Sequence, residues 1–347
     1  MKIMDVTLRD GSYAVNFQIS CALQRLVGCE LEKLGYEYME IGHGMGLGAS
    51  SEKNGIALHT DYEYLAAAQK HFKYIKYGFF CIPGIAGIKD IDLAAEYGCS
   101  FIRIGTNVNE VEQSEAYVKR AKQHGLTVMT NYMKSYVLSP KEFSEQVKKS
   151  ESYGADVIYI VDSSGSMTPE QIEEYYDAIK KVSNITVGFH GHDNLGLALS
   201  NSLKAAELGI TFIDASLQGI GRSSGNTSTE LLTINAIRQG YDLGIDIKQL
   251  LITSKKLIYP LISRKGINPL DVMCGVSEFH TSYLKYIHKT SGLYGVNPLS
   301  LIEEYAKLDK IGMDEHKLEE IAGLLPEDLA SFEDVNFIGY FGNEQKM

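Results

Sequence analysis

The sequence lacks the long apolar runs and basic clusters that would indicate a membrane or a nucleic acid as partner. No apolar stretch among its 347 residues reaches the ~18 residues that a membrane-spanning helix needs, and its first residues lack the apolar core of a signal peptide. Asp and Glu outnumber Lys and Arg, 44 to 33, and the formal net charge is −11. We therefore expect neither membrane nor nucleic-acid binding.

Cysteine is also scarce. The chain has five cysteines and no CxxC pair. An odd number without framework spacing predicts reduced thiols and therefore a cytoplasmic location. Cys81 and Cys99 lie in apolar runs, where we expect them to be core residues.

Short apolar runs alternate with longer segments of helical periodicity, such as 115–125 and 142–154. The predicted strands are 3–8, 38–42, 77–82, 101–105, 127–133, 157–162, 186–192 and 212–217. Glycines typical of helix C-termini come before the next strand at Gly35, Gly98, Gly125, Gly154 and Gly209. Eight strand–helix units predict an α/β fold that closes as a TIM (β/α)8 barrel. The rival, a doubly wound sheet, usually has a glycine-rich phosphate loop after its first strand, where this chain has TLRDGSY.

The pattern changes after residue 240. Segments 247–266, 277–292, 299–308 and 315–325 have helical periodicity, and no strand is predicted between them. We therefore predict a catalytic barrel domain over 1–240 and a helical extension over 241–347 that contributes to the active site. The tail from Asp334 is assigned to no element.

Polar residues gather at the C-terminal ends of the predicted strands, where the loops that carry chemistry in a barrel meet. His190 and His192 share one face of a strand end because side chains alternate along a strand. Asp10, after the first strand, is separated from the seventh strand only by the eighth. One carboxylate and two imidazoles form a common ligand set with positions open for substrate and water. We predict a divalent-metal site, with Mn²⁺ first and Mg²⁺ or Co²⁺ as alternatives; an ordinary polar strand exit is the competing interpretation.

Several neighbours of this set are candidates for binding a substrate. Arg9 is predicted to hold a carboxylate or stabilise an enolate, or else to close the barrel end as a salt bridge. Ser163 either orients a substrate oxygen or caps a helix. Asn226 lies in a glycine-rich loop without the GK[ST] ending of a nucleotide site, and either binds the metal or caps the eighth helix. Further substrate-binding candidates are Glu40, His43 and Asn131.

Three motifs together resemble the DRE-TIM metallolyases, or HMGL-like family. They are TLRDG, HGHDNLG and GIGRSSGNTSTE. Members are divalent-metal TIM barrels that make or break carbon–carbon bonds next to a carbonyl group. EIGHGMGLGASS and YIVDSSGSMTP are most similar to the 4-hydroxy-2-oxovalerate aldolase branch, and the likeness runs from residue 2 to about residue 310. His43 matches this pattern, as a substrate-pocket group or a structural hydrogen-bonding residue.

The resemblance implies an aldolase or lyase acting on a 4-hydroxy-2-oxo acid, which would release a pyruvate enolate and an aldehyde. Asp10, His190 and His192 would hold the metal, and Arg9 would stabilise the enolate. It also implies a homo-oligomer and, as partner, an acylating aldehyde dehydrogenase that takes the aldehyde. Metal catalysis needs no Schiff-base lysine, which fits a sequence with no obviously buried lysine at a strand end.

Two positions depart from the aldolase pattern. Tyr13 stands where the branch has its catalytic histidine, and His280 stands where it has a tyrosine. A tyrosine with a pKa near ~10 is a poor base at neutral pH, so we predict His280 as the general acid/base and Tyr13 as its hydrogen-bond partner. Arg222 replaces a smaller residue and is predicted to bind a second carboxylate or a phosphate.

The exchange of histidine and tyrosine between positions 13 and 280 leaves other functions possible. A Claisen-type synthase that condenses an acyl-CoA, like isopropylmalate and homocitrate synthases, or a lyase like HMG-CoA lyase would also use a histidine from a C-terminal region. A barrel that has lost activity and serves as a partner subunit is a further alternative. The intact Arg9, Asp10, His190 and His192 argue against it.

Overall fold

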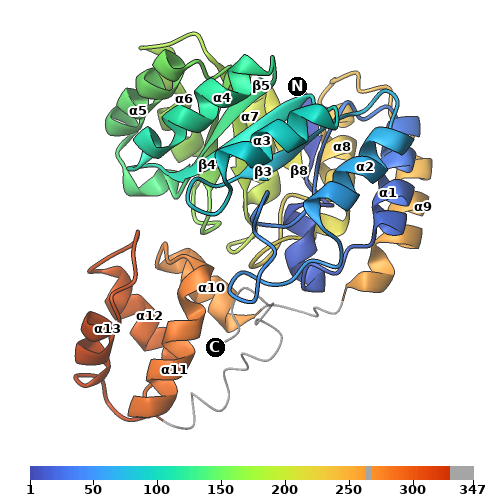
Figure 1. Ribbon diagram of the computed structural model, residues 1–347. Coiled ribbons are helices and arrows are strands. Elements are labelled where there is room, and N and C mark those ends of the chain that lie inside the picture. The colour runs from blue at the N-terminus through green and yellow to red at the C-terminus, as the bar shows by residue number, and fades with distance from the viewer. Residues whose placement is uncertain (263–267, 329–347) are drawn as a thin grey trace.

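Eight parallel strands close into a barrel surrounded by helices in the computed structural model, which describes residues 1–262 and 268–328 (Figure 1). Each strand pairs with the next along the chain, and β8 pairs with β1. The predicted TIM barrel is confirmed. The strands are β1 (Lys2–Asp5), β2 (Tyr38–Ile41), β3 (Lys76–Cys81), β4 (Phe101–Asn107), β5 (Thr127–Met133), β6 (Val157–Asp162), β7 (Thr186–Gly191) and β8 (Phe212–Ala215).

The helices that cover the barrel begin and end at the signals in the sequence. In α5 (Pro140–Tyr153), the Ser139 hydroxyl accepts a hydrogen bond from the backbone N–H of Glu142, and Pro140 occupies the first turn. The helix ends at Gly154, whose φ of 107° is left-handed. The other barrel helices are α1 (Cys21–Lys33), α2 (Asp61–His71), α3 (Ile88–Glu96), α4 (Glu115–Gln123), α6 (Pro169–Lys180), α7 (Ala198–Glu207), α8 (Thr229–Arg238) and α9 (Ile247–Leu257).

None of the helices in the described ranges is both long and apolar enough to cross a membrane.

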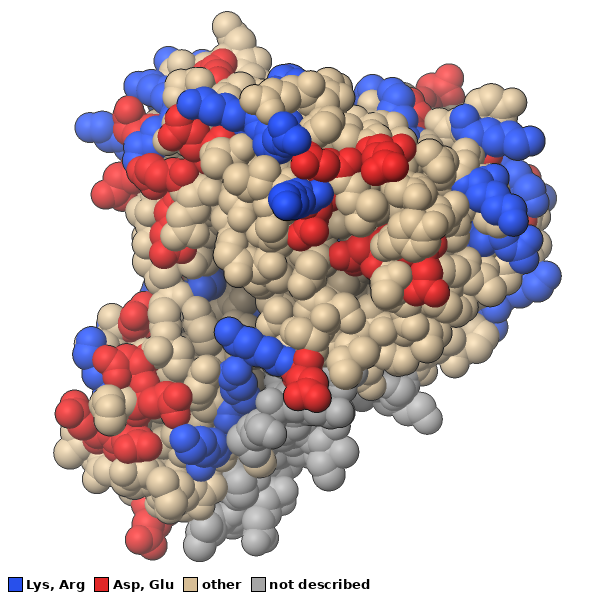
Figure 2. Space-filling model, in the orientation of Figure 1, with Lys and Arg blue, Asp and Glu red and all other residues tan. Residues whose placement is uncertain are grey.

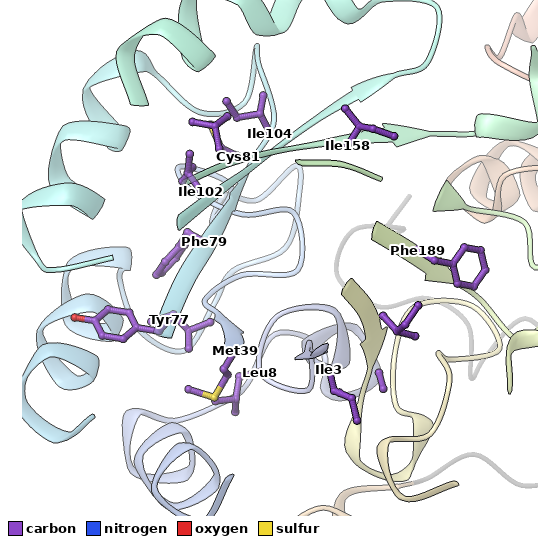
Figure 3. Close-up of a cluster of buried hydrophobic side chains, with 14 of the residues drawn as sticks. Ile3, Leu8, Met39, Tyr77, Phe79, Cys81, Ile102, Ile104, Ile158 and Phe189 are labelled. Carbon is purple, nitrogen blue, oxygen red and sulfur yellow. The ribbon is translucent and has the colours of Figure 1, made fainter. Parts of the chain in front are cut away.

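The main core lies between the strands and the surrounding helices. Alternate strand residues, including Phe79, Cys81, Ile102 and Ile104, point outward into it (Figure 3). Cys81 is fully buried, as predicted for a core residue.

The opposite faces of the strands fill the barrel interior in layers. Tyr38, Phe101, Met129 and Phe212 belong to an apolar layer inside the barrel. Two residues farther along the same strands, the buried side chains are polar: Glu40, Arg103, Asn131 and Asp214. Because side chains on one face recur with period two, the apolar layer lies directly beneath the polar layer, which faces the C-terminal mouth.

The C-terminal helices pack around a separate core. It includes Leu270, Phe279, Leu284 and Tyr305, and the unit lies below the barrel in Figure 1. The helices are α10 (Pro269–Val276), α11 (Leu284–Tyr294), α12 (Pro298–Ala306) and α13 (Glu315–Ala322). The domain boundary at residue 240 stays a prediction; α9 contributes Leu250 to the barrel core.

Three details of this region differ from the sequence prediction. Helix α10 was missed, although Asn268 and Pro269 form a helix start. The segment 277–292 is not one helix, because Glu278 has a left-handed φ of 53° and α11 begins only at Leu284. Helix α9 ends before Pro260, and residues 263–266 of the predicted helix 247–266, like the tail from Asp334, lie outside the described residues.

Candidate metal centre

The three predicted metal ligands converge at the C-terminal mouth of the barrel. One ligand atom each from Asp10, His190 and His192 lie within 4.8 Å of one another, and all three side chains are buried. His190 is in β7, and His192 follows that strand. The predicted first strand was too long: β1 ends at Asp5, and Asp10 opens the 3-10 turn Asp10–Val15 in the following loop.

Each histidine is oriented by a hydrogen bond from its Nδ1. His190 Nδ1 lies 2.8 Å from Asp214 Oδ2, and His192 Nδ1 lies 3.2 Å from the carbonyl oxygen of Gly225. Since both partners are acceptors, Nδ1 carries the proton in each ring and Nε2 keeps its lone pair for a metal. Burial lowers the pKa of His192 to about 3, so its imidazole is in the neutral form that a metal requires.

Asp10 is held as a carboxylate. Burial opposes its ionisation, but the adjacent charge of Arg9 and the hydrogen bond from the backbone N–H of Arg222 hold the pKa of Asp10 well below its usual range. Arg9 donates to Asp10 Oδ2 over 2.5 Å, and the backbone N–H of Arg222 donates to Oδ1 over 3.1 Å. The carboxylate is therefore fixed beside both imidazoles.

Asn226 places an amide oxygen, a candidate fourth ligand atom, next to this set. Its Nδ2 donates to Asp10 Oδ1 (3.0 Å) and to the carbonyl oxygen of Ile220 (3.1 Å), which fixes the orientation of the amide. Its Oδ1 is buried and has no hydrogen-bond partner within the described ranges. Ser228, not Asn226, caps α8. Glycine at position 221 lets the Asn226 amide come close to the loop backbone, because a Cβ there would lie only 2.3 Å from Asn226 Nδ2.

A buried ion-pair network supports the site. Arg9 Nε donates to Glu40 Oε2 over 2.9 Å, and Arg103 donates to the same oxygen (2.7 Å) and to Asp214 Oδ2 (2.6 Å). Two guanidinium groups thus face three carboxylates, counting Asp10, which leaves one excess negative charge. The charge, the neutral imidazoles and the orphaned amide oxygen all fit a hard or borderline divalent cation.

Three predicted substrate-binding residues form hydrogen bonds within the protein. Asn131 Oδ1 accepts from Arg103 Nε (3.2 Å), and Ser163 Oγ accepts from the backbone N–H of Lys134 (2.9 Å). His43 uses both ring nitrogens, accepting from the backbone N–H of Met45 and donating to the carbonyl oxygen of Gly55, and burial lowers its pKa to about 4. Their contacts with a substrate stay predictions.

Residues distant in sequence meet beyond the metal ligands. The Arg222 guanidinium nitrogens lie 3.0 and 2.9 Å from the two ring nitrogens of His280, and its central carbon lies 5.9 Å from the centre of the Tyr13 ring. His280 Nδ1 is also 2.7 Å from Ser282 Oγ. Burial and the charges of Arg222 and Lys134 lower the pKa of His280 well below its usual value. His280 is therefore a neutral imidazole, and Arg222 donates to its unprotonated ring nitrogen.

Lys134 is a buried residue of this region that the sequence prediction missed. The expectation that no strand-end lysine is buried was wrong: Lys134 directly follows β5, and only 4% of it is exposed. Its Nζ donates to the Tyr283 hydroxyl over 2.8 Å and to the carbonyl oxygen of Ile311. Its place directly after the predicted strand 127–133 was the available signal, but its burial depends on the C-terminal unit folding over it.

Comparisons with known proteins agree with this architecture. The HMGL-like family model matches residues 1–257. The 4-hydroxy-2-oxovalerate aldolase of Geobacillus genomosp. 3 is 36% identical over 323 residues, covering 93% of this chain and 96% of that protein. The 4-hydroxy-2-oxovalerate aldolase 2 of Rhodococcus jostii (strain RHA1) is 35% identical over 324 residues, covering 93% and 94%. The HMG-CoA lyase structure from Brucella melitensis shares the fold, with a TM-score of 0.64 at 19% identity over 76% of this chain and 99% of that chain.

Proposed function

The chain belongs to the HMGL-like family, as its motifs predicted, and on that premise we propose that it is a divalent-metal-dependent aldolase that cleaves 4-hydroxy-2-oxo acids. The observation that carries the proposal is the buried convergence of Asp10, His190 and His192. Asn226 Oδ1 would add a fourth protein ligand, and Mn²⁺ is the metal we expect first, with Mg²⁺ or Co²⁺ as alternatives. A cation held there would supply Lewis-acid polarisation of the 2-oxo group.

Arg9 would assist at the same oxygen. Its bonds to Asp10 and Glu40 hold the guanidinium beside the metal ligands, and its central carbon lies 4.8 Å from the centre of the Phe80 ring. A fixed cation at this position would stabilise the negative charge that develops on the 2-oxo group as the bond between C3 and C4 breaks. Because Glu40 and Asp10 already orient Arg9, little reorganisation is needed during the reaction.

His280 would accept the proton of the 4-hydroxyl group. Loss of this proton turns C4 into an aldehyde, and the electron pair of the C3–C4 bond moves to the pyruvate enolate, which then takes a proton at C3. The neutral state of His280 and its contact with Arg222, whose guanidinium also lies over the Tyr13 ring, support this role. An acylating aldehyde dehydrogenase that consumes the aldehyde, and a homo-oligomeric state, remain expectations from the family resemblance.

His280→Ala is expected to lower kcat by about a hundredfold, because general-base catalysis contributes on this scale. Mn²⁺ affinity should change little, since His280 is not among the proposed ligands. Pyruvate release from 4-hydroxy-2-oxopentanoate, followed with lactate dehydrogenase and NADH, measures the first effect, and calorimetric titration with Mn²⁺ measures the second. Tyr13→Phe serves as the comparison and should lower kcat by a smaller factor. Unchanged turnover in His280→Ala would remove His280 from the mechanism.

The exchanged positions of Tyr13 and His280 also favour a second candidate, a synthase that condenses an acyl-CoA with a 2-oxo acid. The two functions are separable in one assay. We expect pyruvate from 4-hydroxy-2-oxo acids and no thiol from acetyl-CoA mixed with a panel of 2-oxo acids. Thiol release without pyruvate formation would contradict the aldolase and support the synthase.

A further inference from the structure

Two cationic side chains of the barrel meet the same short segment of the C-terminal unit. Arg222, between β8 and α8, contacts the ring nitrogens of His280 and donates to Thr281 Oγ1 over 2.9 Å. Lys134, after β5, donates to the Tyr283 hydroxyl, and the Tyr283 ring centre is 5.8 Å from that of His280. The chain thus brings both cations to residues 280–283.

The charge of Lys134 has neutral hydrogen-bond partners in the described part of the chain, namely the Tyr283 hydroxyl and the Ile311 carbonyl oxygen. Two carboxylates are near enough to raise its pKa, Glu110 and Asp309, but both accept hydrogen bonds elsewhere. Glu110 accepts from the side chain of Asn107, and Asp309 accepts from the backbone N–H groups of Ile311 and Gly312.

Burial and the repulsion between these two cations are unfavourable, and the carboxylates of Glu110 and Asp309 offset them only in part at Lys134. Burial and the charge of Arg222 lower the pKa of Lys134 to about 8. An anionic group between Lys134 and Arg222 would offset both the desolvation and the repulsion.

The cluster is continuous with the metal centre. The backbone N–H of Arg222 donates to the metal-ligand candidate Asp10, and the backbone N–H of Lys134 donates to Ser163, at the end of β6. Figure 2 shows a hollow between the barrel and the helical unit, with Lys and Arg side chains along it. A substrate whose 2-oxo acid end lies at the metal would extend its other end toward this cluster.

We propose that Lys134 and Arg222 form an anion-binding subsite that selects substrates whose aldehyde half ends in a carboxylate. The inference rests on the proposed aldolase function and names its substrate class, 4-hydroxy-2-oxo dicarboxylates. Cleavage breaks the C3–C4 bond as described above, and the second carboxylate is unchanged. The products are pyruvate and an aldehyde that carries a carboxylate.

Pyruvate release by the full chain with Mn²⁺ tests the proposal on three substrates that share the reacting end. They are 4-hydroxy-2-oxopentanoate, 4-hydroxy-2-oxohexanedioate and the 5-phosphate ester of 4,5-dihydroxy-2-oxopentanoate. We expect kcat/KM for the dicarboxylate to exceed that for the methyl-ended compound by about thirtyfold or more, because a buried charge pair is worth several kcal/mol. Faster cleavage of the phosphate ester than of the dicarboxylate would overturn the choice of a carboxylate.

Variants test which residues carry the preference. Lys134→Met and Arg222→Gln are each expected to lower the ratio of the two kcat/KM values, dicarboxylate over methyl-ended, about tenfold. The ratio is the decisive readout, because a purely structural defect lowers both values equally. Lys148→Met, at an exposed lysine of α5, is the matched control and should leave the ratio unchanged.

The outcomes separate this inference from the proposed function. Equal cleavage of the dicarboxylate and the methyl-ended compound by the wild type refutes the subsite, while pyruvate release still supports the aldolase. An unchanged ratio in both Lys134→Met and Arg222→Gln also refutes it. Absence of pyruvate from all three substrates overturns the aldolase itself and the subsite with it.

Discussion

His192→Ala is expected to lower kcat/KM for pyruvate release by about a thousandfold or more and to abolish metal binding at the proposed site. Loss of one ligand from a buried set of three leaves the cation incompletely coordinated, and Lewis-acid stabilisation is worth several kcal/mol of the barrier. Metal content after gel filtration and the steady-state rate of pyruvate release should both fall.

The matched control is His316→Ala, since His316 is an exposed histidine of α13. This variant should retain the metal and the wild-type rate. A His192→Ala protein that keeps a full equivalent of metal and normal turnover would contradict the assignment of His192 as a ligand. Thermal unfolding of both variants separates loss of metal from loss of fold.

Arg103→Met is expected to lower the free energy of unfolding by about 3–5 kcal/mol, the cost of leaving buried charges unpaired. Arg103 is fully buried, and its guanidinium compensates the carboxylates of Glu40 and Asp214. It also packs over Tyr159, with 4.2 Å between its central carbon and the ring centre. Methionine fills much of the volume but carries no charge, so Asp214 loses its guanidinium partner and Glu40 keeps only Arg9. Urea unfolding followed by circular dichroism measures the difference.

Arg120→Met makes the same substitution in a surface ion pair. Arg120 pairs with Asp92 at the protein surface, where exposed pairs contribute about 1 kcal/mol or less. If Arg103→Met destabilises the protein no more than Arg120→Met, the buried network does not stabilise the fold as proposed.

The fold was predictable because its signals are local and repeated. Short apolar runs and helix-terminal glycines such as Gly154 mark each strand–helix unit, and eight such units are the number that closes a barrel. The boundaries were less predictable: TLRDG reads as an extension of the first strand, yet β1 ends at Asp5.

The cluster of candidate metal ligands was also predictable, since alternation along β7 places His190 and His192 together and the barrel order places Asp10 nearby. The ion-pair partners were not. Arg103 and Asp214 are separated by 111 residues, and their contact depends on the inward side-chain layers of β4 and β8. Lys134 was missed for a similar reason, because its burial requires contacts with Tyr283 and Ile311.

Restoration of activity to metal-stripped protein tests the central claim most directly. The protein is treated with a chelator, freed of it, and titrated with Mn²⁺ while pyruvate release from a 4-hydroxy-2-oxo acid is followed. We predict no activity without metal and a linear return of activity that saturates at one Mn²⁺ per chain, with no return in His192→Ala. Pyruvate release that persists in the metal-free protein, or that Mn²⁺, Mg²⁺ and Co²⁺ all fail to restore, would contradict a metal-dependent aldolase.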